Sequence, residues 1–298
     1  MKDSASRTAS LIAVGRGLGR VLPAEARLID DPYGERFSTP LLDVVRRHAD
    51  GVLRMVLERF LLAVQVRTRL LDAALLSFLA RGGTQVLLLG AGFDARALRF
   101  AAQLNAAGAR VFEVDHPATQ ATKRARIDAA PHVTYLAWDF EQLATADLPA
   151  ALAACGHDPT APTFVLWEGV TLYLSEPAVD ATTRAVASLC APGSLFAFTY
   201  VDRAALTRPN IAIRLIRLLV RSLGEPITFG FVPSELAAWL ATRGFSLEHD
   251  VSITDAARAL LPARFAALFV GQHARVAFCA RSAQQAASHG EARDPGVP

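Results

Sequence analysis

The spacing of apolar residues changes once along this chain, near residue 82. Before that point apolar side chains recur every three or four residues, for example at Val56, Phe60 and Val64, as on one face of a helix. After Arg81-Gly82-Gly83 the chain enters the unbroken apolar run 86–89, which is typical of a strand covered on both faces. The pattern therefore predicts helices up to about residue 80 and an α/β core after them.

Apolar runs and helical stretches alternate through the rest of the chain, as they do in a parallel sheet with crossover helices. A predicted helix over residues 233–243 ends at Gly244 and precedes two further strands. The predicted strands cover residues 86–89, 110–114, 133–137, 164–167, 194–200, 245–253 and 274–280. We therefore predict a doubly wound, mostly parallel, seven-stranded sheet, an α/β fold of the Rossmann-like kind.

The length of 298 residues suits one large domain followed by a short tail. An insertion between the fifth strand and the last predicted helix carries Arg214, Arg217 and Arg221 on one helical face, which suits either a lid over a substrate or a solvated basic face. Residues 282–298 have no apolar period, so we expect a disordered tail. The single domain, residues 1–281, then divides into a helical cap (1–80), the first five strands (82–202), the insertion (203–232) and a C-terminal helix with two strands (233–281).

Composition narrows the possible partners. The formal net charge is only +3 and the positive residues are scattered, which argues against nucleic acid. Cys155, Cys190 and Cys279 lack the paired spacing of a zinc site, so we expect no metal. The apolar stretches 9–14 and 211–220 are too short for a signal sequence or a membrane span. We expect a cytoplasmic protein with a small-molecule partner, and the sequence leaves its oligomeric state open.

The first predicted strand opens into Gly90-Ala91-Gly92, just before a helix that starts near Ala95. Glycines at such a turn let a ligand approach the backbone closely. About twenty residues later the second strand ends at Asp115, where a carboxylate can accept hydrogen bonds from both hydroxyls of a ribose. Taken singly, the glycine motif would also suit a tight turn without a ligand, and Asp115 would suit an acid at the start of a helix. Together, at this spacing, they favour an adenosine ligand.

Two cofactors contain adenosine in this setting. The turn Gly90-x-Gly92-x-x-Ala95 also satisfies the looser dinucleotide fingerprint, so a nicotinamide cofactor is a serious alternative. Asp139 and Phe140 after the third strand can serve the adenine edge, although Asp139 also suits a solvated turn. The chain closes with one helix and two strands, and a single adenosine needs no second nucleotide-binding half. These features favour a methyl donor.

The fourth strand runs into Glu168 and Gly169, at the edge where open α/β sheets hold their ligands. A carboxylate there can face a sulfonium or an amino group of a ligand. The alternative interpretation is that Glu168 is an acid exposed on a loop, without a ligand. His116, directly after Asp115, better suits the start of a helix. Tyr173 suits packing better than reaction.

These stretches together resemble the leucine carboxyl methyltransferase family of class I S-adenosylmethionine-dependent methyltransferases, which includes bacterial polyketide O-methyltransferases. The resemblance covers nearly the whole chain to about Arg281. It is carried by Asp31-Pro-Tyr-Gly, Val66-Arg67-Thr-Arg69, the glycine turn with Asp94-Ala-Arg96, Glu113-Val-Asp115-His-Pro117, Glu168-Gly-Val-Thr-Leu-Tyr173-Leu and Gly224-Glu-Pro-Ile-Thr-Phe-Gly230.

The resemblance implies that S-adenosylmethionine is the cofactor and assigns residues to its parts. It implies Arg67 on the carboxylate of the donor, a role that the residues alone would not have suggested, because helix arginines commonly snorkel to solvent. It further implies Gly90, Ala91 and Gly92 along the methionine part, Asp115 on ribose, Asp139 and Phe140 at adenine, and Glu168 near the methionine part.

We therefore expect an enzyme that methylates an oxygen of a small metabolite. No histidine with an orienting acid is evident at the sheet edge, and a carboxylate needs no base because it is already an anion near neutral pH, so carboxyl methylation is favoured. Tyr173, Tyr200 or Arg214 could orient the two carboxylate oxygens, and Tyr200 could instead be the base for a hydroxyl. The alternatives are an NAD(P)-dependent oxidoreductase and a non-catalytic donor-binding module.

Overall fold

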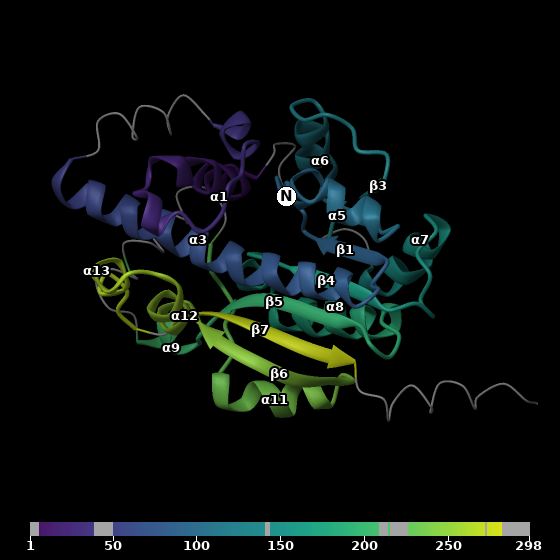
Figure 1. Ribbon diagram of the computed structural model, residues 1–298. Helices are drawn as coiled ribbons and strands as arrows, with labels where there is room; N and C mark the ends of the chain where they lie inside the picture. Colours follow the sequence, from purple (N-terminus) through teal and green to yellow (C-terminus); the bar gives the residue numbers. More distant parts are fainter. Residues whose placement is uncertain are drawn as a thin grey trace, which may run out of the picture.

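The computed structural model describes residues 6–38, 50–140, 144–208, 214, 226–271 and 273–281. At its centre lies a seven-stranded sheet with the order β3-β2-β1-β4-β5-β7-β6 (Figure 1). Neighbouring strands are parallel except that β7 runs antiparallel to both β5 and β6. The strands are β1 Gln85–Leu89, β2 Arg110–Asp115, β3 Val133–Ala137, β4 Thr163–Trp167, β5 Leu195–Val201, β6 Phe245–Ser252 and β7 Ala274–Arg281. The predicted fold class is confirmed, and each predicted strand boundary lies within one residue of the observed one.

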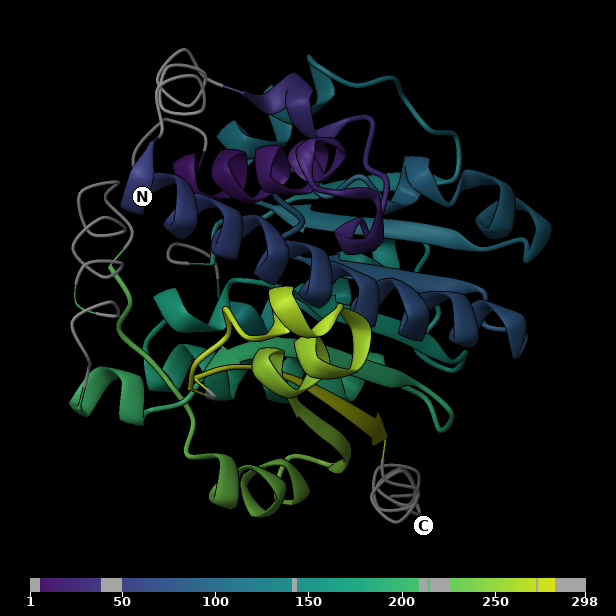
Figure 2. The ribbon, with the colours of Figure 1, turned by 60° about the vertical axis from the view of Figure 1, so that its left-hand side comes forward.

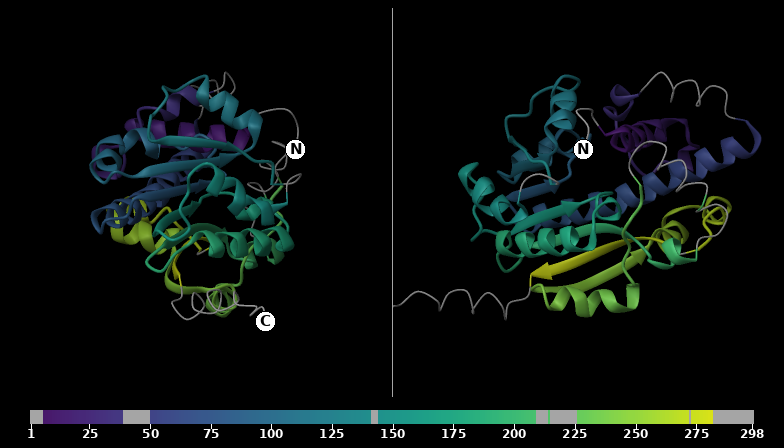
Figure 3. Two further views of the ribbon diagram at one scale, coloured as in Figure 1. Left: turned by 90° about the vertical axis from the view of Figure 1, so that its right-hand side faces the viewer. Right: turned by 180° about the vertical axis from the view of Figure 1, so that it is seen from behind.

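Helices cover both faces of the sheet. Alternate residues of β1 point to opposite faces, so that Val86 and Leu88 pack in one apolar cluster and Leu87 and Leu89 in the other. The long helix α3, Gly51–Ala80, crosses the first face beside α12, Ile253–Leu260 (Figure 2). The helices α7, Leu148–Ala154, and α8, Glu176–Leu189, pack on the second face (Figure 3).

The shorter helices begin where the local sequence favours a helix start. Ser175 caps α8 by accepting a hydrogen bond from the Ala178 amide at 3.4 Å. Four helices, α6, α7, α8 and α11, carry a proline in the first turn, where its missing N–H costs nothing. The other helices whose bounds lie within the described residues are α1 Arg7–Gly17, α4 Arg96–Arg99, α5 Ala101–Ala106, α6 Pro117–Arg124, α9 Ala204–Thr207, α11 Pro233–Ala241 and α13 Ala263–Ala266.

The prediction that residues up to about 80 are helical was too broad. Between α1 and α3 the described chain forms only the 3₁₀ turns η1 Leu18–Val21, η2 Ala24–Ala26 and η3 Gly34–Phe37. Pro23 and Pro32 interrupt this stretch, because proline lacks the amide that a continuing helix requires. The Asp31 side chain instead accepts hydrogen bonds from the amides of Tyr33 and Gly34, at 3.0 and 3.1 Å.

The sequence analysis missed α12 and α13, which lie between the last two strands. Ser252 ends β6 and caps α12, since its hydroxyl oxygen accepts the Asp255 amide at 3.0 Å. The apolar face of α12, including Ala256 and Ala257, packs in the same cluster as α3. The signal was the Ser252-x-x-Asp255 cap, which the apolar strand pattern hid.

The predicted insertion and tail fall largely outside the described residues. Within the insertion Arg214 is helical and exposed, whereas Arg217, Arg221 and residues 282–298 lie outside the described part. In the described ranges no helix has both the length and the apolar character to cross a membrane. In the same ranges no cluster of three or more His, Cys, Asp or Glu residues could hold a metal ion.

The strand order creates a crevice beside β1. The chain leaves β1 for β2 and β3 on one side and then returns to β4 on the other, so β1 lies at the topological switch point. Loops that leave neighbouring strands in opposite directions diverge there, which opens a space at the carboxyl ends of the strands. The helix α1 lies at this end of the sheet (Figures 1 and 2).

Candidate active site

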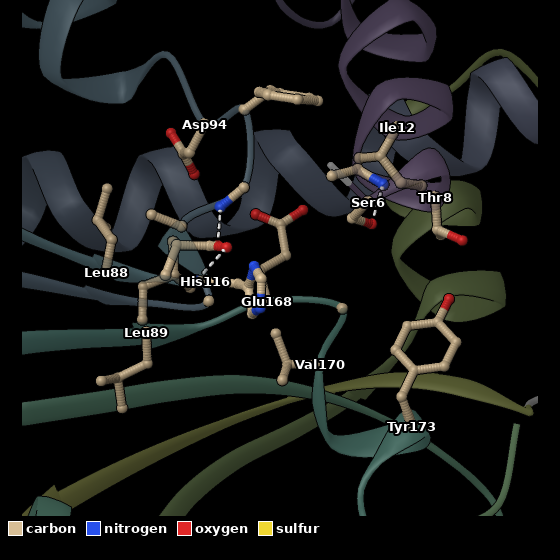
Figure 4. A pocket seen from close by; sticks show the side chains of 18 of the residues that line it. Ser6, Thr8, Ile12, Leu88, Leu89, Asp94, His116, Glu168, Val170 and Tyr173 are labelled. Carbon is tan, nitrogen blue, oxygen red and sulfur yellow. Dashed lines mark hydrogen bonds between the residues drawn. The ribbon is translucent and has the colours of Figure 1, made fainter. Parts of the chain in front are cut away.

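A cavity of about 1170 Å³, counting the open space at its mouth, lies at the carboxyl ends of β1 and β4 (Figure 4). Its walls come from α1, α3, the turn after β1, the ends of β2 and β3, and the loop after β4 that contains η5, Thr171–Tyr173. Segments far apart in the sequence therefore meet at one place. The lining includes every residue that the sequence analysis assigned to cofactor binding, namely Arg67, Gly90, Ala91, Gly92, Asp115, Asp139, Phe140 and Glu168.

The turn after β1 depends on glycine. Gly90 and Gly92 have φ angles of +62° and +49°, in the left-handed region that other residues rarely adopt. A Cβ atom at Gly90 would also lie 2.4 Å from Cγ2 of Val170, and one at Gly92 would lie 3.2 Å from Cβ of Ala9 on α1. The two glycines thus allow α1 and the β4 loop to close around the turn while its backbone still faces the cavity.

Asp115 ends β2 beside this turn. Its Oδ2 accepts the Gly92 amide at 2.5 Å, and its Oδ1 accepts the amide of His116 at 2.7 Å. Burial raises the pKa of Asp115, although these two hydrogen bonds act in the opposite direction. Each carboxylate oxygen has a second lone pair, so the side chain can still accept hydrogen bonds from a ligand diol.

His116 connects the ends of β2 and β3. It caps α6 as expected, because its Nδ1 accepts the Ala118 amide at 3.2 Å. In the neutral ring the proton then lies on Nε2, which is 3.4 Å from Oδ2 of Asp139. His116 also lines the cavity, which the sequence analysis did not predict.

Glu168 lines the cavity (Figure 4). Its carboxylate lies between two arginines. Its Oε1 is 2.7 Å from Nε of Arg67, and its Oε2 is 2.7 Å from Nη1 of Arg96. Burial opposes ionisation of Glu168, but the positive charges of Arg96 and Arg67 outweigh it and hold its pKa well below the usual range. Glu168 is therefore an anion at neutral pH, with Arg67 as its partner at the cavity wall.

Arg96 anchors this carboxylate from behind. Its side chain is buried, and besides Glu168 it binds Asp94 through Nη1 and Asp72 through Nε, the latter at 2.7 Å. Arg99 extends the network through a 2.5 Å contact with Asp72. Asp94-Ala-Arg96 contributes to the family resemblance, but no role for Arg96 was predicted, because nothing in the local sequence indicates that it reaches Glu168.

Arg16 fastens α1 to the glycine turn. Its Nη2 donates to the carbonyl oxygen of Phe93 at 2.6 Å, and its Nε pairs with Asp31 at 3.0 Å. The Asp31-Pro-Tyr-Gly stretch thus has a structural role, since Asp31 holds both Arg16 and η3. The sequence analysis missed the whole contribution of α1 to the cavity, which comprises Ser6, Thr8, Ala9, Ile12 and Arg16.

The three residues predicted to orient an acceptor lie in different places. Tyr173 lines the cavity from η5. Arg214 is exposed and is not part of the lining, and most of its sequence neighbours lie outside the described residues, so its role stays a prediction.

Tyr200 lies outside the cavity lining, and its predicted role is corrected. The side chain is only 2% exposed, and its hydroxyl donates to Oδ2 of Asp250 at 2.8 Å within the sheet. Arg275 pairs with the same carboxylate at 3.0 Å. Burial and the hydrogen bond to Asp250 raise the pKa of Tyr200 well above its usual value. Because this hydroxyl is buried in the sheet and donates to Asp250, it reaches no acceptor in the cavity, either as a base or as a hydrogen-bond donor.

Comparison with known proteins gives one consistent result. The family model "Leucine carboxyl methyltransferase" matches residues 9–187. A Mycolicibacterium gilvum protein named as a presumed S-adenosyl-L-methionine-dependent methyltransferase is 34% identical over 216 residues, or 67% of each chain. A Streptomyces avermitilis protein with the same kind of name is 34% identical over 212 residues, which cover 66% of this chain and 70% of that protein.

Two crystal structures share the fold. A presumed methyltransferase from Thermobifida fusca has a TM-score of 0.58 at 19% identity, covering 94% of this chain and 96% of its own. A DUF574 family protein from Streptomyces avermitilis has a TM-score of 0.61 at 12% identity, covering 93% of this chain and 98% of its own.

The sheet order and the cavity at its switch point, together with these matches, define a class I, Rossmann-like methyltransferase. The chain belongs to the leucine carboxyl methyltransferase family, whose members depend on S-adenosylmethionine. This assignment does not favour the NAD(P)-dependent oxidoreductase that the glycine turn had left as an alternative.

Proposed function

We propose that the enzyme binds S-adenosylmethionine in this cavity and transfers the methyl group to a carboxylate oxygen of a small metabolite. The observation that carries the proposal is the Arg67–Glu168 pair, which lies beside the glycine turn at the switch point of the sheet. The guanidinium of Arg67 and the carboxylate of Glu168 carry opposite charges. They complement the carboxylate and the ammonium group on the methionine part of the donor. The proposed partner is a small molecule, neither nucleic acid nor a membrane.

The residues around the cavity fit the parts of the donor. Arg67 can bind the donor carboxylate, and Glu168 can bind its ammonium group. Asp115 faces the cavity beside Gly92, where a ribose diol would meet its remaining lone pairs. Asp139 and Phe140 supply an acceptor and an aromatic face for adenine. The donor, once bound, supplies an electrophilic methyl group on a positively charged sulfur.

Carboxylate methylation suits the groups that line this cavity. A carboxylate is already ionised near neutral pH, so the protein only has to align the attacking oxygen with the methyl carbon and the leaving sulfur. A hydroxyl acceptor would need a base. The imidazole of His116 is engaged on both sides, by the Ala118 amide and by Asp139, which suits a positioning role. The description of the matching family names carboxyl methylation as well.

The chemistry of the product tests the proposal. Methyl groups would be transferred from labelled S-adenosylmethionine to a panel of carboxylic acids and phenols, and the products treated with mild alkali. A methyl ester releases methanol under these conditions, whereas an aryl methyl ether survives. Alkali-stable products alone would contradict carboxyl methylation but leave donor binding intact, and donor binding without any turnover would favour the non-catalytic module.

Asp115→Ala is expected to weaken binding of S-adenosylhomocysteine by about 1–3 kcal/mol, roughly tenfold or more, because two charge-assisted hydrogen bonds to ribose are lost. Titration calorimetry on the folded variant measures this loss. Asp202→Ala is the matched control, since Asp202 follows β5 at the same edge of the sheet but caps the Ala204 amide outside the cavity lining. An unchanged dissociation constant in Asp115→Ala would show that Asp115 only holds the glycine turn.

A further inference from the structure

Part of the cavity wall makes none of the proposed contacts with the donor. Those contacts come from α3, the turn after β1 and the ends of β2, β3 and β4. Much of the remaining lining comes from the inner face of α1 and the loop after Gly169, which face each other across the cavity (Figure 4). We call this part the α1 subsite, and it comprises Ser6, Thr8, Ala9, Ile12, Val170, Tyr173 and Leu174.

We propose that the α1 subsite binds the methyl acceptor, that the acceptor is a small carboxylic acid with an apolar body, and that the hydroxyl of Thr8 donates a hydrogen bond to its carboxylate. This inference rests on the proposed function. It adds the class of acceptor and a residue that selects it.

Thr8 is a polar group of the α1 subsite whose burial needs an explanation. Its hydroxyl oxygen is buried and has no hydrogen-bond partner among the described residues. Helix α1 begins at Arg7, so Thr8 lies in its first turn. By contrast, the hydroxyl of Thr122 in α6 donates to the Ala118 carbonyl at 2.9 Å. A buried hydroxyl without a partner destabilises a folded protein, so a ligand that pairs with it accounts for its presence.

The position of Thr8 suits an acceptor. Its side chain lines the cavity, and in Figure 4 its hydroxyl points from α1 toward the hydroxyl of Tyr173 on η5. The cavity wall between the two elements is apolar, with Ile12 on α1 and Val170 and Leu174 on the loop. A ligand here would therefore meet hydroxyl groups at one end and aliphatic side chains along its body.

Charge favours a carboxylate in this place. The arginines that border the cavity already have carboxylate partners: Arg16 pairs with Asp31, and Arg67 pairs with Glu168. The α1 subsite itself contributes no charged side chain. The positive sulfonium of a bound donor is then the charge that would attract an acceptor carboxylate. The sulfur that carries this charge is also the leaving group of the methyl transfer, so the attraction draws the carboxylate toward the methyl carbon. A hydroxyl donor such as Thr8 can orient the carboxylate without neutralising it.

The test uses the full-length enzyme with 3-phenylpropionate, octanoate and acetate as probes, and the primary amide of the first as an uncharged match. Each probe is titrated by calorimetry into enzyme saturated with sinefungin, a donor analogue that cannot transfer a methyl group and carries an ammonium group in place of the sulfonium. We expect the two apolar carboxylates to bind more tightly than acetate or the amide. Thr8→Val should weaken binding of 3-phenylpropionate about tenfold, because it replaces the hydroxyl by a methyl group of similar size. Its affinity for S-adenosylhomocysteine should not change, and its melting temperature should be equal or higher.

Three further variants sharpen the test. Thr8→Ser keeps the hydroxyl and should retain probe binding. Ser10→Ala is the matched control, since Ser10 lies on the same helix but outside the cavity lining, with its hydroxyl near the Ser6 carbonyl. Ile12→Trp should fill the subsite and block the probes while S-adenosylhomocysteine still binds, so the inference can be tested even if Thr8→Val folds poorly.

Each contrary result has a distinct meaning. If Thr8→Val weakens S-adenosylhomocysteine but not 3-phenylpropionate, Thr8 binds the donor and the inference is overturned. If none of the carboxylates binds the loaded enzyme, or if Ile12→Trp leaves their binding unchanged, the α1 subsite is not their site. If S-adenosylhomocysteine itself fails to bind the unaltered enzyme, the proposed function fails first.

Discussion

Replacing Arg96 with methionine is expected to lower the free energy of unfolding by about 3–5 kcal/mol at neutral pH, the usual loss when one partner of a buried ion pair is removed. Arg96 is 1% exposed and contacts the carboxylates of Asp72, Asp94 and Glu168. Methionine fills a similar space but carries no charge. The three buried carboxylates would then lose the guanidinium that they share, and their burial as anions would destabilise the folded protein. Urea unfolding followed by circular dichroism measures the loss.

The size of this loss should depend on pH. Burial opposes ionisation of Asp94 and Glu168, but the charge of Arg96 outweighs it, and the pKa of each acid is lowered in the folded protein. Acids with a lowered folded pKa contribute stability above their unfolded pKa and lose it as the pH falls. The loss caused by Arg96→Met should therefore be complete at pH 7 and shrink below about 4.5, the ordinary pKa of a glutamic acid.

Arg20→Met is the matched control for this experiment. It breaks the Arg20–Asp30 pair, whose two side chains are 50% and 65% exposed, and such surface pairs contribute little to stability. Equal effects of the two substitutions, or a loss in Arg96→Met that is the same at pH 4 and pH 7, would show that the buried charges are not its cause.

Glu168→Gln is expected to raise the dissociation constant for S-adenosylmethionine by about 10- to 100-fold, or about 1.4–2.7 kcal/mol. The substitution keeps the shape of the side chain but removes the negative charge that would face the donor's ammonium and sulfonium groups. In the free enzyme this carboxylate is held between Arg67 and Arg96, so the neutral amide would also leave Arg67 without an anionic partner. Calorimetry with the folded variant measures the change.

The two forms of the cofactor make this prediction specific. S-adenosylmethionine carries a positive sulfur that S-adenosylhomocysteine lacks, so Glu168→Gln should reduce affinity for the former more than for the latter. Glu176→Gln is the control, because Glu176 is an exposed acid that pairs with Arg203 away from the cavity lining. An equal loss for both cofactor forms would mean that Glu168 acts on the ammonium group alone, and no loss for either would place the methionine part elsewhere.

Several features of this protein follow from its sequence alone. The central strands β1 and β4 were found within one residue because a strand buried on both faces leaves an unbroken apolar run such as 86–89, and crossover helices separate such runs. The glycine turn, Asp115 and Glu168 were also visible, because each follows directly on a strand and the carboxyl ends of parallel strands meet at one edge. Local patterns are sufficient wherever the backbone itself determines the position of a side chain.

Other features were decided only by the tertiary structure. The Tyr200 side chain is held by Asp250 and Arg275, which are brought beside it by strand pairing rather than by sequence spacing. Its place in the predicted site was wrong for that reason.

The tertiary structure also decided the α1 side of the cavity and the contacts of Arg96. Thr8 lines the cavity, Arg16 meets the glycine turn and Arg96 meets Glu168 only because the packing of the chain brings remote segments together. An exposed helix arginine and one that holds an active-site carboxylate look the same in a sequence, since the difference lies in the charges that surround them after folding.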